Sequence, residues 1–564
     1  MNRWAYTRPE GFRDDSPETA AQVHFIESTV LDLCRRRGFL QVMVPTLEYA
    51  DLYHPARIGT ALFHQLMVAR VAEAREFPSH PADHPGVGCG QGGRAIHEVV
   101  LRPDMTAPVA RAFVSRLLER GIPTERPVRM SYAGQVFRDQ APDFDRLKEF
   151  RQVGVESVGA RGFAVDLEVV LLAWDAAVRL EVPGARLCVS HAALTPALVQ
   201  ALGITRPDAR NAVVAGLQQL RTLLRRTRVS GTPLRSVVQE QMVGLRARSI
   251  PVPEWAGRLD ELDDETVRSR VVAHLADRLQ AQWVGTWGVP TDRARRLVTL
   301  ASLESPAQEF RAALTGLAVV DDRVAATLEI LTGVAAELEA RRASVPVLAA
   351  VSSGAPGYYT GMTFELHSMT PEHGAVRICG GGRYDRLHRW IYDRAVATAG
   401  RGSVGSLPPL PDDLFCAIGF AFGVERVRRV LPQRSNETSL PNLVRVQAEN
   451  GAQDLDALAL SERLREVIRA PVIWYPAIGE GTPGAGRKRL VREAGARISS
   501  GAVAGPGDGA RAAPGGGVDV VVLGSGMLRV TDRATGRVWQ VAGEDAAGVF
   551  FQELLATDRN EGKE

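Results

Sequence analysis

Hydrophobic positions in the first third of the chain repeat with two different periods. Apolar residues recur at helical spacing through residues 19–37, and a basic last turn followed by glycine indicates where that helix ends. Residues 39–45 have strand character and end at a proline. Two runs of strand formers, 128–137 and 150–157, flank a polar stretch, which predicts an antiparallel hairpin. An amphipathic helix is expected over residues 165–180.

The middle of the chain has mainly helical patterning. Residues 204–342 are dominated by leucine, alanine, valine and arginine at helical spacing, which predicts a helical insertion. Strand character returns at 363–366, 376–379 and 416–422, and a helix is expected from 424 to 431.

A third pattern follows a boundary near Pro432–Pro441. Short apolar runs alternate with helical spacing, which predicts a small α/β domain with a partly parallel sheet. Residues 499–517 bury too little apolar surface to offset the entropy of ordering, so we expect a flexible insert there. The expected organisation is a core in two parts, 1–203 and 343–435, an insertion over 204–342, and a C-terminal domain over 441–555.

Composition limits the class of protein. The 564 residues are 45% hydrophobic and 24% charged, as in globular proteins, and a net charge of +3 is no argument for nucleic-acid binding. Five scattered cysteines without a Cys-x-x-Cys pair argue against a disulfide framework or a structural zinc site. The sequence has no signal-peptide core and no apolar run of about 18 residues, so we expect a cytoplasmic protein without a membrane span.

Histidine positions give little reason to expect a metal. His80, His84 and Cys89 lie in a glycine- and proline-rich stretch that we interpret as a mobile loop, and no fourth ligand is near them. His373 and His388 are expected to be ordinary surface groups. No metal ion and no other cofactor is predicted.

Two arginines suggest anion binding, although neither does so strongly by itself. Arg138 ends a predicted strand, from which a guanidinium can bind a phosphate through two parallel hydrogen bonds. Arg426 lies at a predicted helix start after several small residues, where backbone and side chain can approach an anion. Pairing with a carboxylate, or exposure on a helix surface, is the alternative for each.

Several motifs follow one another in an informative order. They are the stretch 38–48, Leu-Arg-Pro-Asp-Met-Thr at 101–106, Phe-Arg at 137–138 with 146–156, Gly-Tyr-Tyr-Thr-Gly at 357–361, Gly-Gly-Arg-Tyr-Asp at 381–385, and 419–426. This order resembles the class II aminoacyl-tRNA synthetase core of the histidyl type over roughly residues 5–435. The resemblance implies an α+β fold with a six- or seven-stranded antiparallel sheet flanked by helices, dimerising through motif 1. It also implies that the C-terminal domain is like the synthetase's anticodon-binding domain.

The same resemblance implies a histidine site. The residues it assigns to histidine binding are Asp104, Thr106, Arg146, Gln152, Glu156, Tyr358, Tyr359 and Tyr384. Glu156 would accept from the imidazole, and the α-amino group would be held by Asp104, Thr106 and Gln152, because an ammonium group favours a carboxylate and neutral acceptors. The phosphate or nucleotide contacts would be Arg138 and Arg426. The alternative is that these residues survive as packing and hydrogen-bonding scaffold.

The chain departs from the synthetase where the chemistry is done. The family has an arginine four residues before the first tyrosine of Gly-Tyr-Tyr-Thr-Gly, and here that position is Gly354. The motif 2 glutamate is replaced by Gln140, and the Arg-Pro-Gln of the loop that reads tRNA is replaced by Ala-Pro-Asp at 141–143. Losing a cation that stabilises transition-state charge can cost about 100- to 1000-fold in rate.

This pattern of loss is similar to the regulatory subunit of ATP phosphoribosyltransferase, a paralogue of the synthetase. The resemblance implies a non-catalytic protein that binds histidine, pairs with a short catalytic subunit in the first step of histidine biosynthesis, and transmits feedback inhibition by histidine. It also implies a homodimer with no role in binding tRNA. One alternative is an active histidine–tRNA ligase with a cation from Arg341 or Arg342, and a second is a paralogue that senses another ligand.

Overall fold

The computed structural model describes most of the first 432 residues and a smaller share of the others. The described residues are 8–72, 96–140, 147–228, 238–239, 242–243, 252–317, 319–341, 345–351, 358–370, 374–399, 410–411, 413–432, 444–448, 460–461, 464, 472–475, 518–522, 527–532 and 538–542. The chain divides into two compact units, Met1–Pro432 and Gln433–Glu564. Within the described ranges, no helix has both the length and the apolar character needed to cross a bilayer.

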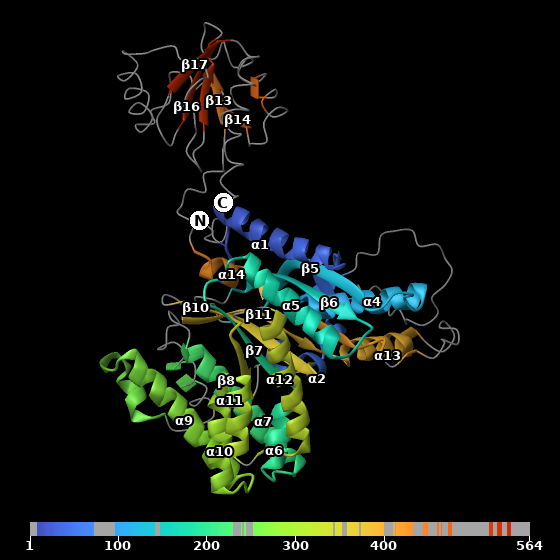
Figure 1. Cartoon of the computed structure of the whole chain (residues 1–564), viewed down its shortest axis with the longest axis vertical. Helices are drawn as coiled ribbons and strands as arrows, with labels where there is room; N and C mark the ends of the chain where they lie inside the picture. Colours follow the sequence, from blue (N-terminus) through green and yellow to red (C-terminus); the bar gives the residue numbers. More distant parts are fainter. Residues whose placement is uncertain are drawn as a thin grey trace. The chain divides into compact units, whose positions relative to one another are not determined.

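A nine-stranded sheet forms the centre of the first unit, in the order β1-β5-β6-β12-β11-β10-β7-β9-β8 (Figure 1). The strands are β1 (Leu40–Gln41), β5 (Val128–Phe137), β6 (Glu149–Val158), β7 (Ala185–His191), β8 (Glu304–Pro306), β9 (Val347–Ala350), β10 (Met362–Thr370), β11 (Gly374–Arg383) and β12 (Ala417–Gly423). The run from β5 to β7 is antiparallel, while β1 and β9 pair in parallel with β5 and β7. The expected antiparallel sheet is present, and short strands at its edges extend it beyond six or seven strands.

The predicted hairpin is confirmed and carries much of the later argument. β5 and β6 are ten residues each and pair antiparallel from Val128↔Val158 to Phe137↔Glu149. The strand expected over 39–45 is much shorter, because regular pairing with β5 covers only Leu40–Gln41.

Helices pack against both faces of the sheet. On one face lie α1 (Pro17–Arg36), α5 (Phe163–Arg179) and α14 (Val424–Val430), which share an apolar core with Val153 and Val155 of β6. A separate apolar cluster includes residues of α4 (Thr106–Arg120) and α13 (Leu387–Ala399), two helices that contact each other. The helices predicted at 19–37, 165–180 and 424–431 are therefore confirmed to within a few residues.

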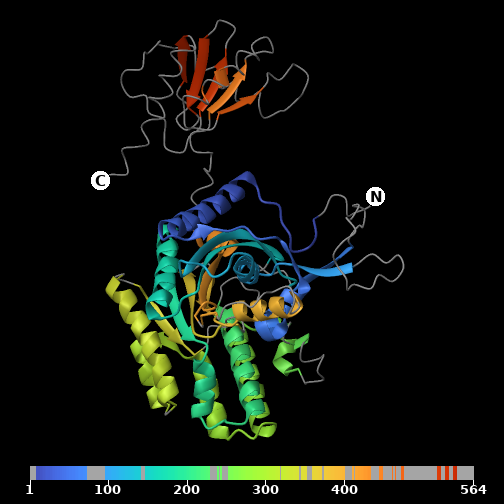
Figure 2. The same ribbon diagram turned by 90° about the vertical axis from the view of Figure 1, so that its right-hand side faces the viewer.

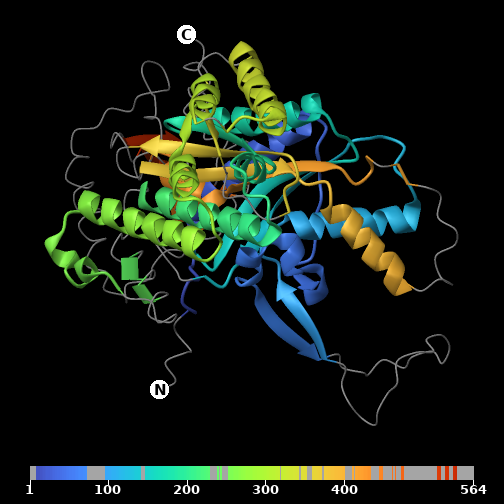
Figure 3. The same cartoon turned by 90° about the horizontal axis from the view of Figure 1, so that it is seen from below.

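A small sheet adjoins this body, with the order β2-β4-β3. Its strands are β2 (Leu47–Tyr49), β3 (Met67–Ala72) and β4 (Ile96–Leu101), and short helices follow β2: η2 (Ala50–Leu52), α2 (Pro55–Ile58) and α3 (Thr60–Phe63). Figure 3 shows β3 and β4 as two blue arrows that extend from the body of the unit.

The stretch expected to be a helical insertion is mainly helical in the residues described. Its helices are α7 (Pro207–Arg228), η3 (Glu254–Gly257), η4 (Leu259–Glu261), α9 (Asp264–Gly285), α10 (Thr291–Ser302), α11 (Ala307–Gly316) and α12 (Asp322–Arg341), preceded by α6 (Leu194–Ala201). Figure 2 shows them gathered at one end of the first unit. The pattern did not predict the strand at Glu304–Pro306, where this segment pairs with β9 as the edge strand β8.

The second unit contains a five-stranded sheet in the order β14-β13-β15-β16-β17. Its strands are β13 (Val444–Ala448), β14 (Val472–Tyr475), β15 (Val518–Val522), β16 (Met527–Asp532) and β17 (Val538–Ala542). The first three are mutually parallel and the last two antiparallel, which confirms a partly parallel sheet. The proposed insert 499–517 lies outside the described residues, as does the loop 73–94.

Candidate functional site

One face of the central sheet carries rows of residues aligned across several strands, and we call it the site face. Because strand residues alternate between faces, cross-strand partners share a face. The first row is Glu156, Gly419, Gly382 and Thr363; the second is Tyr132, Gly154, Ala421, Gly380 and Glu365; the third includes Gly134, Gln152 and Gly423. The middle of these rows consists of glycine and alanine, so the backbone forms a floor between larger side chains.

Glycine is required at Gly419 by close approach. A Cβ atom added there would lie 1.8 Å from Oε2 of Glu156 and 2.4 Å from the carbonyl oxygen of Val155. At Gly382, an added Cβ would lie 2.9 Å from ring atoms of Tyr359. The Glu156 carboxyl and the Tyr359 ring therefore lie directly against the backbone of this glycine-rich floor, at Gly419 and Gly382.

Glu156 is the buried acidic group of the site. Its side chain is in a residue only 1% exposed, and the hydroxyl of Tyr132 donates to Oε1 at 3.2 Å. The hydroxyl of Tyr384 donates to Oε2. Burial raises the pKa of Glu156 to about 8, although hydrogen bonds from Tyr384, Thr106 and Tyr132 oppose the rise. The carboxyl is therefore mostly protonated at neutral pH without a ligand.

Three tyrosine rings form an aromatic wall beside this carboxyl. Tyr358 lies with its ring centre 4.8 Å from that of Tyr359 and 5.7 Å from that of Tyr384. The ring of Tyr384 stacks in turn on the imidazole of His388 at 5.6 Å. The expectation that His388 is a surface group was wrong: it is 0% exposed, and burial lowers its pKa to about 3.

The start of α4 brings further polar groups to the site. Asp104 is 5% exposed, accepts from the backbone N–H of Ala107 at 3.2 Å, and has a pKa raised by burial. The side chain of Gln152 accepts from the backbone N–H of Met105 at 3.1 Å, which ties β6 to the residues before α4. Thr106 begins α4, and its hydroxyl hydrogen-bonds with Glu156.

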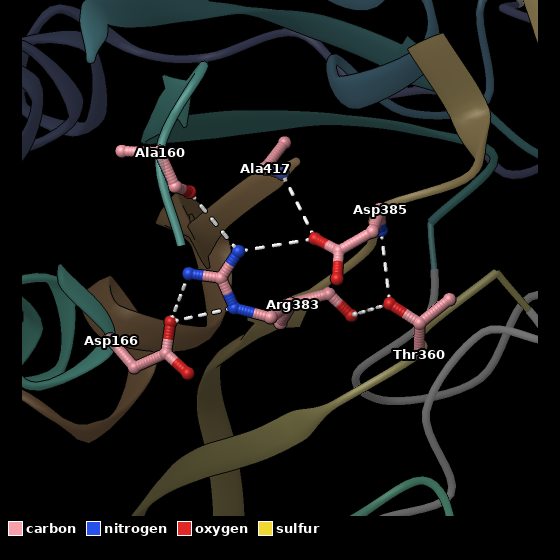
Figure 4. Close-up of polar contacts among 6 residues, drawn as sticks. All are labelled: Ala160, Asp166, Thr360, Arg383, Asp385 and Ala417. Carbon is pink, nitrogen blue, oxygen red and sulfur yellow. Dashed lines mark hydrogen bonds and ion pairs between the residues drawn. The ribbon is translucent and has the colours of Figure 1, made fainter. Parts of the chain in front are cut away.

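A buried ionic network locks the two tyrosine motifs together (Figure 4). Arg383 donates through Nε to Asp166 at 2.8 Å and through Nη1 to Asp385 at 3.1 Å. The backbone N–H of Asp385 donates to Thr360 Oγ1 at 2.9 Å, and the backbone N–H of Ala417 donates to Asp385 at 3.2 Å. Because Thr360 follows Tyr359 and Arg383 precedes Tyr384, this network fixes both rings relative to the sheet.

Arg138 and Arg426, the two arginines considered for phosphate binding, lie near one end of the site face. Arg138 donates through Nε to the carbonyl of Pro103 at 2.9 Å and stacks over the ring of Phe150 at 5.0 Å. The side chain of Arg426 passes the Cα of Gly423, since a Cβ added there would lie 3.6 Å from Cδ of Arg426. Gly423 lies opposite Gln152, so Arg426 is beside the Gln152 row, and Arg138 follows the end of β5 beyond that row, farther from Glu156.

The remaining positions considered from sequence are either elsewhere or not described. Arg146, Gly354, Arg342 and the stretch 141–143 lie outside the described residues. Arg341 ends α12 and pairs with Glu337 on its own helix. The amide of Gln140 donates to the carbonyl of Leu147 at 2.8 Å. Across the described part of the chain, no cluster of three or more His, Cys, Asp or Glu residues could hold a metal ion.

Sequence reasoning missed several residues of this site. Tyr132 could have been found from the hairpin, because its register places Tyr132 opposite Gly154, two residues before Glu156. Asp166 had no local signal, since its role depends on Arg383 from a distant segment. Gly419 begins the motif at 419–426, but its contact with Glu156 could not be read from that motif.

Comparisons with known proteins agree with this architecture. The family model described as histidyl-tRNA synthetase matches residues 95–235 and 258–404, just over half of the chain. An ATP phosphoribosyltransferase regulatory subunit of Symbiobacterium thermophilum is 29% identical over 81% of this chain and 88% of that protein. A histidine–tRNA ligase of Methanocaldococcus jannaschii is 24% identical over 75% of each chain. A regulatory subunit of Moorella thermoacetica is 31% identical, but the match spans only 46% of that protein and 37% of this chain.

Solved structures support the fold. A histidyl-tRNA synthetase from Nostoc matches with a TM-score of 0.58 at 12% identity, covering 97% of this chain and 99% of that one. A structure described as an ATP phosphoribosyltransferase regulatory subunit/histidyl-tRNA synthetase from Bacillus halodurans matches with a TM-score of 0.53 at 21% identity, covering 86% of this chain and 97% of that one. The sheet, its flanking helices and the family match lead to one conclusion: the chain belongs to the histidyl-tRNA synthetase family.

Proposed function

We propose that this chain is a non-catalytic regulatory subunit of ATP phosphoribosyltransferase that binds histidine and transmits feedback inhibition. The observation that carries the proposal is a contrast within one site. Side chains suited to an imidazole and an ammonium group converge around Glu156, whereas the synthetase's arginine is replaced by Gly354.

The chemistry of the site suits histidine. An imidazole N–H placed against Glu156 gains a charged or neutral acceptor, and the tyrosine rings exclude water from it. Asp104 and Gln152, with the Thr106 hydroxyl, supply the carboxylate and neutral oxygens that an ammonium group favours. Bound histidine would place its imidazole and ammonium groups next to Glu156 and Asp104, two buried acidic side chains.

The same site is poorly equipped to activate an amino acid. Adenylation develops negative charge on phosphate, and a preorganised cation there contributes about 3 to 4 kcal/mol. Glycine at position 354 cannot supply it, and Arg341 is paired with Glu337. The regulatory reading is supported further by relatives named as regulatory subunits that match over more than four-fifths of this chain.

Association with other chains is part of the proposal. Exposed apolar side chains near β1, β2 and β3 suit the homodimer contact that we propose, because an exposed apolar patch commonly marks an interface. They are Leu40, Met43, Leu47, Tyr49 and Val68, of which Met43 is 90% exposed. A short catalytic phosphoribosyltransferase subunit would be the second partner. Coupling between its active site and the histidine pocket would be about 1–3 kcal/mol.

Histidine-dependent exchange of pyrophosphate into ATP tests the non-catalytic reading. We expect no exchange above a control without histidine, in protein whose melting temperature histidine raises. The competing function is an active histidine–tRNA ligase, favoured by the Methanocaldococcus relative and by Arg138 and Arg426 beside the site. Clear exchange, followed by charging of tRNA, would establish that function instead.

A further inference from the structure

A further arginine, Arg377, lies on the site face, at a position that none of the motifs contains. β11 pairs with β10 through Glu365↔Gly380 and His367↔Arg377, with a shift in register between Leu366 and His367. Glu365 and His367 are two residues apart on β10 and share a face, so Arg377 shares the face of Gly380 and of the floor. Without the shift, residues 377 and 380 would lie on opposite faces, so the bulge places this guanidinium over the site.

The guanidinium extends along the floor toward the site. A Cβ added to Gly380 would lie 3.9 Å from Nη1 of Arg377, so the cation lies above the glycine rather than away from the sheet. The ring of Tyr359 lies over Gly382, because a Cβ added there would lie 2.9 Å from its ring atoms, and Gly382 is the next residue on the same face of β11 after Gly380. Tyr359 belongs to the aromatic wall, so the cation lies beside the candidate pocket.

A buried carboxylate orients this cation without using all of its donors. Nη1 of Arg377 lies 3.0 Å from Oε1 of Glu365, a residue 2% exposed whose Oε2 is 3.1 Å from Nε2 of His367. Among the described residues, Glu365 is the partner of Arg377, and the arginine side chain is still 39% exposed. A guanidinium has five N–H donors in a rigid fork, so it can bind a second carboxylate while Glu365 holds it.

The spacing fits an α-amino acid. The Glu156 carboxyl lies over Gly419, because a Cβ added to Gly419 would lie 1.8 Å from its Oε2. The position above Gly380 is therefore one strand and one same-face step from the carboxyl, or roughly 8 Å from a strand spacing of about 4.8 Å and a repeat of about 6.8 Å. A histidine spans roughly 6 Å from imidazole nitrogen to carboxylate oxygen, and a hydrogen bond of about 2.8 Å at each end gives a reach of up to about 12 Å, which covers that separation. A ligand bound by Glu156 at its ring would therefore present its carboxylate near Arg377.

We propose that Arg377 binds the carboxylate of the amino acid held in this pocket and so distinguishes histidine from decarboxylated analogues. The inference rests on the proposed histidine pocket. It adds a contact for the carboxylate, the one functional group of histidine that the proposed contacts to the imidazole and the α-amino group leave unbound. Arg377 would bind the ligand's carboxylate but would not replace the catalytic arginine that the synthetase has at position 354. Glu365 acts through Arg377 and is a positioning residue.

Calorimetric titration with L-histidine and with histamine, which lacks only the carboxylate, tests the proposal. Wild-type protein should favour histidine about 10- to 100-fold, as expected for a charge-assisted, partly buried contact. Arg377→Gln should remove most of this preference by weakening histidine while leaving the affinity for histamine within about threefold. Arg186→Gln is the matched control, because Arg186 on β7 lies opposite His367 of β10, is exposed, and is two strands farther from the pocket than Arg377.

Three outcomes would overturn the inference. Equal losses for both ligands, or an unchanged preference in Arg377→Gln, would mean that Arg377 does not contact the carboxylate. Because Arg377→Gln leaves Glu365 buried without its cation, the double variant Glu365→Gln/Arg377→Gln should be measured as well and should also lack the preference. If the wild type binds neither ligand, the proposed histidine pocket itself is wrong and the inference falls with it.

Discussion

Replacing Glu156 by glutamine should remove a pH dependence from the stability of the first unit. The wild-type carboxyl is buried on the floor between two tyrosine hydroxyls, and its pKa is raised to about 8. In the unfolded chain the same group ionises near its ordinary value of 4.5. Glutamine resembles the protonated carboxyl in shape and cannot ionise. Glu156→Gln therefore keeps the packing similar and removes the ionisation of this side chain.

The direction of the effect follows from proton linkage. A carboxyl whose folded pKa exceeds its unfolded pKa contributes its full stabilisation below the unfolded value and loses it as pH rises to the folded value. For Glu156 this window runs from 4.5 to about 8. At about 1.4 kcal/mol per pH unit, its contribution to the free energy of unfolding should fall by about 2 to 3 kcal/mol between pH 5.5 and 7.5. The free energy of unfolding of Glu156→Gln should therefore rise by the same amount relative to that of wild type between pH 5.5 and 7.5.

Urea unfolding at the two pH values measures this difference. Because the chain contains two compact units, unfolding should be followed by hydrogen exchange of peptides from β6, which belongs to the first unit. Glu168→Gln is the control, since Glu168 is half-buried on α5 and paired with Arg129 at 3.2 Å. Parallel pH profiles for wild type and Glu156→Gln, within about 0.5 kcal/mol, would refute the reasoning that this carboxyl is protonated in the fold.

Two other substitutions test the floor and the network beneath the tyrosines. Gly419→Ala should destabilise the first unit by about 3 kcal/mol or more in urea unfolding and weaken histidine binding in calorimetry, because its Cβ would clash with Glu156 and with backbone. Gly285→Ala is the control and should be nearly neutral in both measurements, because Gly285 has open space around it in α9. Asp166→Ala should cost about 3 kcal/mol in urea unfolding by leaving the buried Arg383 guanidinium without its main partner, and a loss below about 1 kcal/mol would show that the ion pair is dispensable.

Long, regular elements could be predicted from sequence because each is specified by local pattern. The β5–β6 hairpin has strand formers on both sides of a polar loop, and α1 has a clear apolar stripe and a basic end. The order of the motifs also identified the family. Short elements could not be predicted in this way: β8 consists of Glu304–Pro306 and exists only because β9 lies beside it.

The site was predictable as a list of residues but not as a geometry. Glu156 and the tyrosines could be named from their motifs. The role of Gly419 could not, because it depends on the Glu156 carboxyl of the neighbouring strand lying 1.8 Å from where a Cβ on Gly419 would be. His388 was misassigned because sequence alone does not reveal that Tyr384 and Phe113 enclose its ring. The face on which Arg377 lies depends on one shift in strand register, which no local sequence signal specifies.

The central claim is that this chain regulates a partner and does no chemistry itself. The most direct measurement is formation of phosphoribosyl-ATP by a short catalytic phosphoribosyltransferase subunit, with and without this chain, across a series of histidine concentrations. The account predicts that activity appears only when both chains are present and that histidine inhibits it. Absence of any stimulation by folded chain that binds histidine, or stimulation that histidine does not reduce, would contradict the account.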